Sequence, residues 1–228
     1  MDKDVGIVGF GAYIPQPRLR RSAIAAANAW ANAALKGAAK GERAICGWDE
    51  DVVTMAVEAA RDALGSRPRE GVSACILAST SAPFADRLNA GLVAGALNLP
   101  QTLDSLDIGG SMRAGTSALV AGLAMAQTRE GQVLVAAGER RGAKPASLAE
   151  MQYGDAAACL ILGRDPVARI IAHRTVTRDF VDHFRAAGQK YDYGWEERWV
   201  RDEGYAKLVP AALKAAFRDV NLAPKDVT

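Results

Sequence analysis

Short apolar segments alternate with helix-forming segments along most of this chain, and this alternation limits the possible folds more than any other feature. The apolar segments are predicted strands, and they occupy residues 5–14, 74–78, 102–108 and 132–137. The alanine-rich or amphipathic segments between them are predicted helices, and they occupy residues 22–39, 54–64, 89–97 and 114–128. Elements in this order form layered α/β domains, so we predict an α/β fold with a mostly parallel central sheet.

Local signals locate the ends of some of these elements. Asp49 or Asp51 is predicted to cap the N-terminus of the second helix, and Gly65 is predicted to close it. Beyond the last helix, residues 156–162 and 167–176 are predicted to be two strands that pair with each other across a short turn.

A change of composition divides the chain into three parts. Residues 1–176 hold the α/β pattern, and residues 177–205 interrupt it with polar and aromatic side chains, as in a surface excursion. Residues 206–228 begin a further part with an amphipathic helix.

The composition also excludes several functions. Lys+Arg 28 and Asp+Glu 26 nearly balance, so we expect no nucleic-acid partner, and basic clusters such as Arg140, Arg141 and Lys144 are interpreted as solvated loops. No stretch approaches the roughly 20 apolar residues of a membrane span. The 3 cysteines and 2 histidines form no metal-binding pattern. We therefore expect a cytoplasmic protein with no metal and no membrane partner.

Four local patterns resemble one enzyme family. They are residues 9–15 (GFGAYIP), 49–61 (DEDVVTMAVEAAR), 113–119 (RAGTSAL) and 153–158 (YGDAAA). Together with the order of segments, they resemble the thiolase superfamily, in its hydroxymethylglutaryl-CoA synthase-like branch, which is also similar to the ketoacyl-ACP synthases. The resemblance implies a thiolase-like half of the form βαβαβαββ. It also implies a second, similar half, of which residues 206–228 would be only the start.

The resemblance implies a cysteine nucleophile that this chain lacks. Alignment on Arg113 and the residues after it puts Met112 at that position, and a thioether can neither ionise nor form a thioester. Ser111, the neighbouring residue, is a weak alternative nucleophile, with a plain turn or hydrogen-bonding role as the other interpretation. A second difference lies after the second strand, where Thr80 stands at the position of the family's glutamate acid/base, and a threonine does not titrate near neutral pH.

The scaffold around the nucleophile position is nevertheless present. Gly109 and Gly110 permit a tight turn, and Arg113 opens a helix whose free N–H groups favour a developing oxyanion. The resemblance therefore implies that these three residues bind a coenzyme A thioester, which would be a substrate or ligand rather than a cofactor. Arg18 is a candidate for the phosphates of coenzyme A, with an ordinary basic loop as the alternative.

Two functions remain open at this point. The first is a subunit of the acyltransferase or lyase kind that handles acyl-CoA without a cysteine acyl-enzyme, with aldol, retro-aldol or Claisen-type chemistry. The second is a non-catalytic subunit that braces a catalytic partner. For both functions, the resemblance implies that the protein forms a homodimer. It also implies a further partner, which would be a second chain with the other thiolase half, a zinc-ribbon/OB-fold protein, or both.

Overall fold

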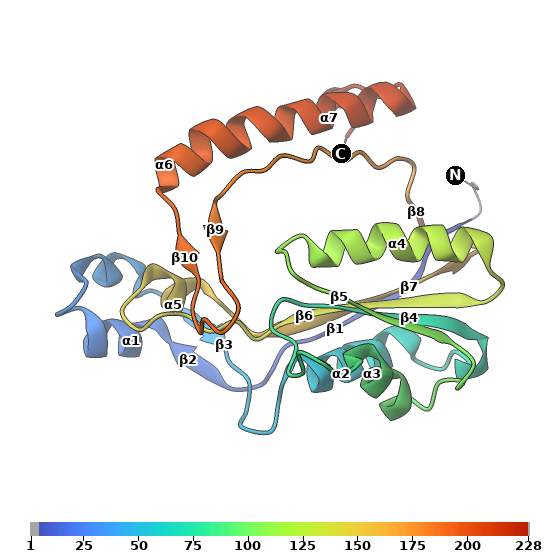
Figure 1. Ribbon diagram of the computed structural model, residues 1–228, viewed down its shortest axis with the longest axis horizontal. Coiled ribbons are helices and arrows are strands. Elements are labelled where there is room, and N and C mark those ends of the chain that lie inside the picture. Colours follow the sequence, from blue (N-terminus) through green and yellow to red (C-terminus); the bar gives the residue numbers. More distant parts are fainter. Residues whose placement is uncertain (1–4, 228) are drawn as a thin grey trace. The chain divides into compact units, whose positions relative to one another are not determined.

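The computed structural model describes residues 5–227 and divides into two compact units, the first ending at Arg169 and the second beginning at Ile170. Figure 1 shows the elements of each unit. The division lies close to the composition change predicted after residue 176, and the three-part assignment itself stays a prediction. Residues 1–4 and 228, at the outer limits of the predicted parts, lie outside the described residues.

The first unit is built on a six-stranded sheet with the order β5-β4-β6-β7-β1-β8. Its strands are β1 (Val5–Tyr13), β4 (Val72–Ala78), β5 (Asp104–Ile108), β6 (Gln132–Glu139), β7 (Ala156–Arg164) and β8 (Ala168–Arg169). β4 pairs with β5 and with β6 in parallel, whereas β7 pairs antiparallel with both β6 and β1. The α/β fold is therefore confirmed, with a mixed sheet: β1, β4, β5 and β6 share one direction, but most pairings are not parallel.

The last strand of the sheet corrects one prediction. β8 pairs with β1 and not with β7, so β1 lies between the two segments that were predicted to pair with each other. β8 is also only 2 residues long, far shorter than the predicted strand at residues 167–176. After the turn that follows β7, the chain therefore does not pair with β7 but crosses β1 and pairs with the outer edge of β1.

Helices cover both faces of the sheet (Figure 1). α2 (Val52–Leu64) and α3 (Asn89–Ala96) lie on one face, and α4 (Ala114–Thr128) lies on the other. α2 begins where expected, because the Asp51 side chain accepts a hydrogen bond from Thr54 N and the Thr54 hydroxyl accepts one from Asp51 N. It ends at Gly65, whose φ of 51° suits a glycine.

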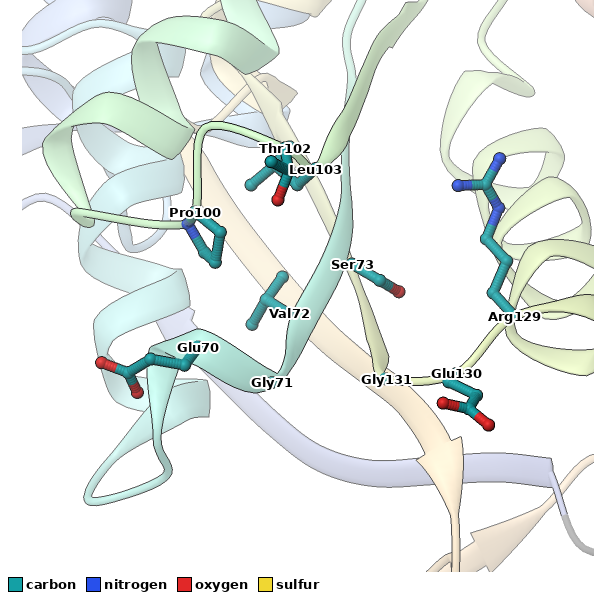
Figure 2. Close-up of a pocket in the computed structure, with 10 residues that line it drawn as sticks. All are labelled: Glu70, Gly71, Val72, Ser73, Pro100, Thr102, Leu103, Arg129, Glu130 and Gly131. Atoms are coloured by element: carbon teal, nitrogen blue, oxygen red, sulfur yellow. The ribbon is translucent and has the colours of Figure 1, made fainter.

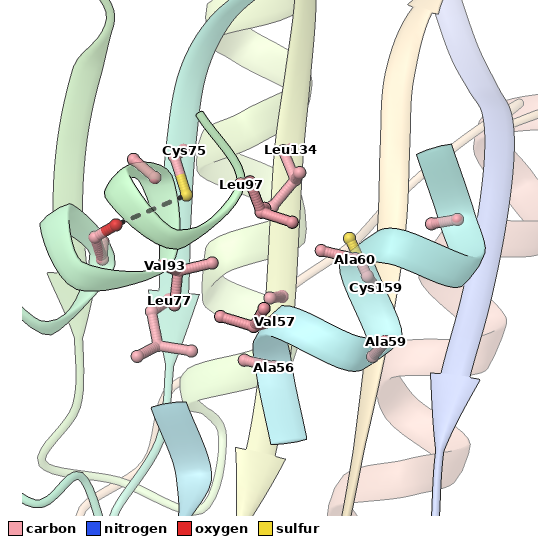
Figure 3. Close-up of a cluster of buried hydrophobic side chains, with 14 of the residues drawn as sticks. Ala56, Val57, Ala59, Ala60, Cys75, Leu77, Val93, Leu97, Leu134 and Cys159 are labelled. Atoms are coloured by element: carbon pink, nitrogen blue, oxygen red, sulfur yellow. Dashed lines mark hydrogen bonds between the residues drawn. The ribbon is translucent and has the colours of Figure 1, made fainter. Parts of the chain in front are cut away.

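The core lies between the sheet and the pair of helices α2 and α3 (Figure 3). Leu77 of β4, Leu134 of β6 and Cys159 of β7 are almost fully buried there. They pack against alanines and valines of α2 and against Val93 and Leu97. Small residues let the helix approach the sheet closely, and a Cβ added to Gly11 of β1 would lie only 2.3 Å from Ala63 N.

The segment predicted as one helix over residues 22–39 contains two shorter elements. α1 (Arg21–Asn28) ends early, and a 3-10 helix follows at Ala33–Ala38, with the Asn32 side chain accepting a hydrogen bond from Ala34 N. Asn32 also donates to Ala146 O, a contact far along the chain. An asparagine that bonds neighbouring backbone competes with the helix, so alanine content alone overestimates the helix length here.

Small elements surround this region. A two-stranded sheet joins β2 (Arg18–Arg20) and β3 (Glu42–Ala44), and α5 (Leu148–Gln152) packs with its buried Met151 beside α1. Neither the sheet nor α5 was predicted.

The second unit contains a short hairpin, β9 (His183–Phe184) with β10 (Tyr193–Gly194), and a continuous helical segment. That segment starts inside the predicted excursion, as α6 (Glu197–Trp199), then passes through π-helical Val200–Tyr205 into α7 (Ala206–Val220). Phe180 stacks on Trp199 with ring centroids 4.4 Å apart. The Phe180 ring lies so near Gly204 that a Cβ added to Gly204 would be 2.8 Å from the ring.

Candidate active site at the strand ends

The candidate site lies at the carboxyl ends of three neighbouring strands. β5, β4 and β6 run parallel, and their register aligns Ala78 with Ile108 on one side and with Ala137 on the other. The residues that follow these positions therefore share one edge of the sheet, which is where ligands bind in many α/β folds. Thr80 and Glu139 meet at this edge.

The turn after β5 is held by its own backbone and by that of β4. Gly110 has a φ of 76°, which favours glycine, and a Cβ on Gly109 would lie 3.0 Å from Ser79 O. Ser111 Oγ accepts a hydrogen bond from Arg113 N at 3.1 Å, so this hydroxyl stabilises the turn. Met112 follows with its side chain 57% exposed, directly before the residue that caps α4.

A carboxylate from β6 lies against the loop after β4. Glu139 Oε1 accepts a hydrogen bond from Thr80 N at 2.7 Å. Its Oε2 accepts from the Thr80 hydroxyl at 3.1 Å and from Ser81 Oγ at 2.6 Å. Ser81 Oγ in turn accepts from Arg140 N at 2.9 Å, so the loops after β4 and β6 hold each other. Charged hydrogen bonds of this kind fix a side chain firmly.

A buried guanidinium completes this group. Arg141 is only 9% exposed, and its Nη1 donates to Thr80 Oγ1 at 2.8 Å. The same nitrogen also donates to Met112 Sδ. The Thr80 hydroxyl therefore lies between a cation and an anion, accepting from Arg141 and donating to Glu139. A thioether sulfur is only a weak acceptor, so the bond to Met112 is the weaker of the two.

Beside these residues lies a cavity of about 500 Å³, which we name the Met112 cavity. Met112, Gly115 and Glu139 form part of its wall. Most of the remaining wall is small and apolar: Ala12, Ala78, Ala114, Ala137, Ala156, Ala157 and Ala158. Its size is in the range of small-molecule sites, and an apolar wall with a few polar groups is typical of them.

Two other cavities differ from this one in position or lining. A cavity of about 360 Å³ lies on the other side of the glycine turn and includes Thr80, Gly109 and Gly110 in its wall. The cavity in Figure 2, about 460 Å³, is formed by residues around the amino ends of β4 and β6, such as Val72 and Gly131. It lies at the opposite ends of the parallel strands and shares no residue with the Met112 cavity.

The structure thus brings together most of the residues that the sequence singled out. Thr80, Met112 and the two glycines gather at the strand ends, and Arg113 occupies the N-cap position of α4 beside them, without a side-chain cap hydrogen bond. Arg18 lies elsewhere, on β2 in the two-stranded sheet, and donates to the carbonyls of residues 15, 16 and 17 of its own turn. The roles of all these residues stay predictions.

Two functional candidates escaped the sequence reasoning, namely Glu139 and Arg141. Glu139 lies two residues after the strand predicted at residues 132–137, which is the available signal, and the sequence interpretation places Arg141 in a solvated basic loop. Arg141 does lie in a loop, but its burial shows that the prediction of a solvated side chain was wrong.

Two thiols of the first unit are unsuited to act as nucleophiles near neutral pH. Burial, reinforced by the nearby carboxylate of Asp155, raises the pKa of the Cys46 thiol to about 12, and burial raises that of Cys75 to about 12. Neither thiol is therefore ionised near neutral pH. Within residues 5–227, no group of three or more His, Cys, Asp or Glu side chains could hold a metal ion. No helix in that range is long and apolar enough to cross a membrane.

The fold and the turn that joins β5 to α4 define an α/β protein of the thiolase-like class. The sequences of known proteins support this class. Hydroxymethylglutaryl-CoA synthase of Methanobrevibacter smithii is 32% identical over 231 residues, covering 97% of this chain and 66% of that protein. The synthase of Pyrococcus horikoshii is 29% identical, covering 98% of this chain and 64% of the relative. No family model matches the chain.

Solved structures show the same fold. A hydroxymethylglutaryl-CoA synthase complexed with CoA gives a TM-score of 0.82 at 20% identity, covering 98% of this chain and 58% of that one. OleA of Xanthomonas campestris with bound lauric acid and lauroyl-CoA gives 0.84 at 18% identity, covering 99% and 76%. The chain belongs to the thiolase superfamily, as a hydroxymethylglutaryl-CoA synthase-like N-terminal half. It spans about 65% of the length of the synthases that it matches.

Proposed function

We propose that this chain binds an acyl-CoA thioester non-covalently, with the acyl group in the Met112 cavity. The observation that carries the proposal is the position of Met112, in the cavity wall at the start of α4. Related structures contain CoA in one case and lauroyl-CoA in another, which supports a thioester as the ligand class. A thioether cannot accept an acyl group, so the thioester would stay attached to CoA throughout.

The cavity supports an acyl chain rather than a polar ligand. Its wall is largely alanine, and Gly115 of α4 faces Ala137 of β6 so closely that a Cβ on Gly115 would lie 3.6 Å from the Ala137 Cβ. Glu139 is the one charged residue among the described residues that line the cavity, and the first residues of α4 also belong to the wall. A thioester that entered there would place its carbonyl near Glu139 and its chain among the alanines. Burial of each methylene contributes about 0.8 kcal/mol.

Binding tests the proposal directly. We expect calorimetry to show that lauroyl-CoA binds the wild-type chain more tightly than CoA alone. Ala137→Leu fills part of the cavity and should displace about two methylenes, which would weaken lauroyl-CoA binding roughly tenfold. Ala124→Leu is the matched control, because Ala124 is an exposed residue of α4 outside the cavity wall. Equal affinities for lauroyl-CoA and CoA, unchanged by Ala137→Leu, would contradict the proposal and favour the bracing subunit.

The absence of an acyl-enzyme is tested by intact mass. After incubation with acetyl-CoA, we expect no acyl addition to the wild-type chain and an addition to Met112→Cys, because the start of α4 favours a thiolate. Ser111→Cys controls for the position of the new thiol. An acyl adduct on the wild-type chain would refute the non-covalent part of the proposal.

A further inference from the structure

We propose that Glu139 is the catalytic residue that moves a proton to and from the acyl-CoA bound in the Met112 cavity. This inference rests on the proposed function and adds a chemical step to it. The resemblance places the family's acid/base glutamate at Thr80, after β4. In this structure a carboxylate from the end of β6, that of Glu139, is hydrogen-bonded to Thr80.

The contacts of Thr80 show how the Glu139 carboxylate is held beside it. Both the backbone N–H and the hydroxyl of Thr80 donate to the Glu139 carboxylate, at 2.7 and 3.1 Å. A glutamate side chain at residue 80 would have extended toward the same region of the loop. The threonine is short enough to leave that space to Glu139 and supplies a hydroxyl that holds it.

Hydrogen bonds hold the Glu139 carboxylate in place and still leave it able to accept another one. Its Oε2 accepts two hydrogen bonds, but Oε1 accepts only the one from Thr80 N among the residues that the structure describes. Oε1 therefore keeps a lone pair, and Glu139 is part of the cavity wall. A carboxylate that is fixed by hydrogen bonds, keeps an acceptor site and belongs to the wall of a ligand cavity is a candidate general base.

Arg141 supplies the complementary charge. Its buried Nη1 donates to the Thr80 hydroxyl and to the sulfur of Met112, and that sulfur is a weak acceptor. A thioester oxygen is a much better acceptor than a thioether, so a bound acyl-CoA would take over this N–H at little cost. A fixed guanidinium next to the carbonyl oxygen stabilises the negative charge that develops there when the neighbouring carbon loses a proton.

The step balances without any further reactant. Glu139 takes a proton from C2 of the acyl group, and the C2–H electron pair forms the C2–C1 double bond of an enolate. The carbonyl electron pair moves to the thioester oxygen beside Arg141. Return of a proton from the carboxylic acid restores the acyl-CoA. In heavy water, exchange of the carboxyl proton with solvent would place deuterium at C2.

The substrate class follows from this step. It would be an acyl-CoA with at least one hydrogen at C2, or a 3-hydroxyacyl-CoA, whose C2–C3 bond can break to release a carbonyl compound and the enolate of the shortened acyl-CoA. In that cleavage a base takes the 3-hydroxyl proton, and the enolate is then protonated at C2.

Deuterium exchange into lauroyl-CoA in heavy water, measured by mass spectrometry, tests the proposal. We expect the wild-type chain to exchange C2 hydrogens above the solvent background, and Glu139→Gln to slow the exchange by about 10²- to 10⁴-fold. Glu139→Asp keeps the carboxylate and should recover part of the rate. Glu130→Gln, at the opposite ends of the strands (Figure 2), is the control and should exchange as the wild type does.

Calorimetry on the same proteins separates this inference from the proposed function. If Glu139→Gln binds lauroyl-CoA as the wild type does and loses exchange, the inference is supported. If it binds and still exchanges at the wild-type rate, or if the wild type binds without exchange, the inference is wrong and the proposed function stands. If the wild type does not bind lauroyl-CoA, both are wrong.

Discussion

The Asp107 side chain of β5 accepts hydrogen bonds from the first residues of α3. Replacing this side chain tests how much the contact between β5 and α3 stabilises the fold. Its Oδ1 accepts a hydrogen bond from Ala90 N at 2.7 Å, and its Oδ2 accepts from Asn89 N at 2.8 Å and Asn89 Nδ2 at 2.9 Å. The N-cap residue of α3, Leu88, provides no side-chain cap of its own. Asp107 of β5 therefore caps α3 from a distance.

The magnitude follows from these three bonds. Hydrogen bonds to a charged group contribute about 1.5–3 kcal/mol each, and bonds that share one carboxylate are not additive. Asp107→Ala also leaves the backbone N–H groups of Asn89 and Ala90 without this acceptor, whereas Asn89 Nδ2 still donates to Phe84 O and Arg87 O. We expect a loss of about 4 kcal/mol in the free energy of unfolding for Asp107→Ala, and about 2 kcal/mol for Asp107→Asn, which keeps one acceptor. For a chain of this size, 4 kcal/mol corresponds to about 10 °C in Tm.

Urea unfolding followed by circular dichroism measures these losses. Asp104→Ala is the matched control, because Asp104 lies on the same strand in a solvent-exposed ion pair with Arg129. Exposed pairs contribute at most about 1 kcal/mol. If Asp107→Ala costs no more than Asp104→Ala, with the same dependence on urea, the long-range cap does not stabilise the protein and the reasoning fails.

Two further predictions concern close packing and buried thiols. Gly11→Ala forces a Cβ to within 2.3 Å of Ala63 N and should destabilise the chain by about 1–3 kcal/mol, whereas Gly71→Ala, with open space around its Cβ, should stay within about 0.5 kcal/mol in the same urea assay. The thiols of Cys46 and Cys75, whose pKa is raised from 9.0 to about 12, are protonated in the folded state at a pH where the unfolded chain ionises. Native protein should therefore resist iodoacetamide at about pH 8, and stability should fall as the pH rises from about 9 towards about 12; rapid alkylation of the native chain would contradict this.

Elements whose ends carry local signals were predicted well. The Asp51 cap and Gly65 delimit α2, and the boundaries of α4 also match, because α4 begins directly after the glycine turn. The helical segment that contains α7 starts earlier than predicted, because no turn separates α7 from the π-helical residues before it. The strand after residue 167 was mispredicted for a different reason. An apolar segment next to a turn indicates a strand, but only the free edge of β1 determines which strand it pairs with.

The site was predictable only as far as its residues share a motif. Met112 and the glycine turn belong to one continuous segment, so the local pattern was enough to find them. Glu139 and Thr80 are 59 residues apart, and they meet because β4 and β6 are parallel neighbours whose carboxyl ends lie together. Loss of a glutamate at residue 80 therefore indicates loss of an acid/base group only if no neighbouring strand replaces it. Here Glu139 hydrogen-bonds to Thr80, at the position where the resemblance implies the family's glutamate, so a threonine at this position is as consistent with a relocated carboxylate as with an inactive site.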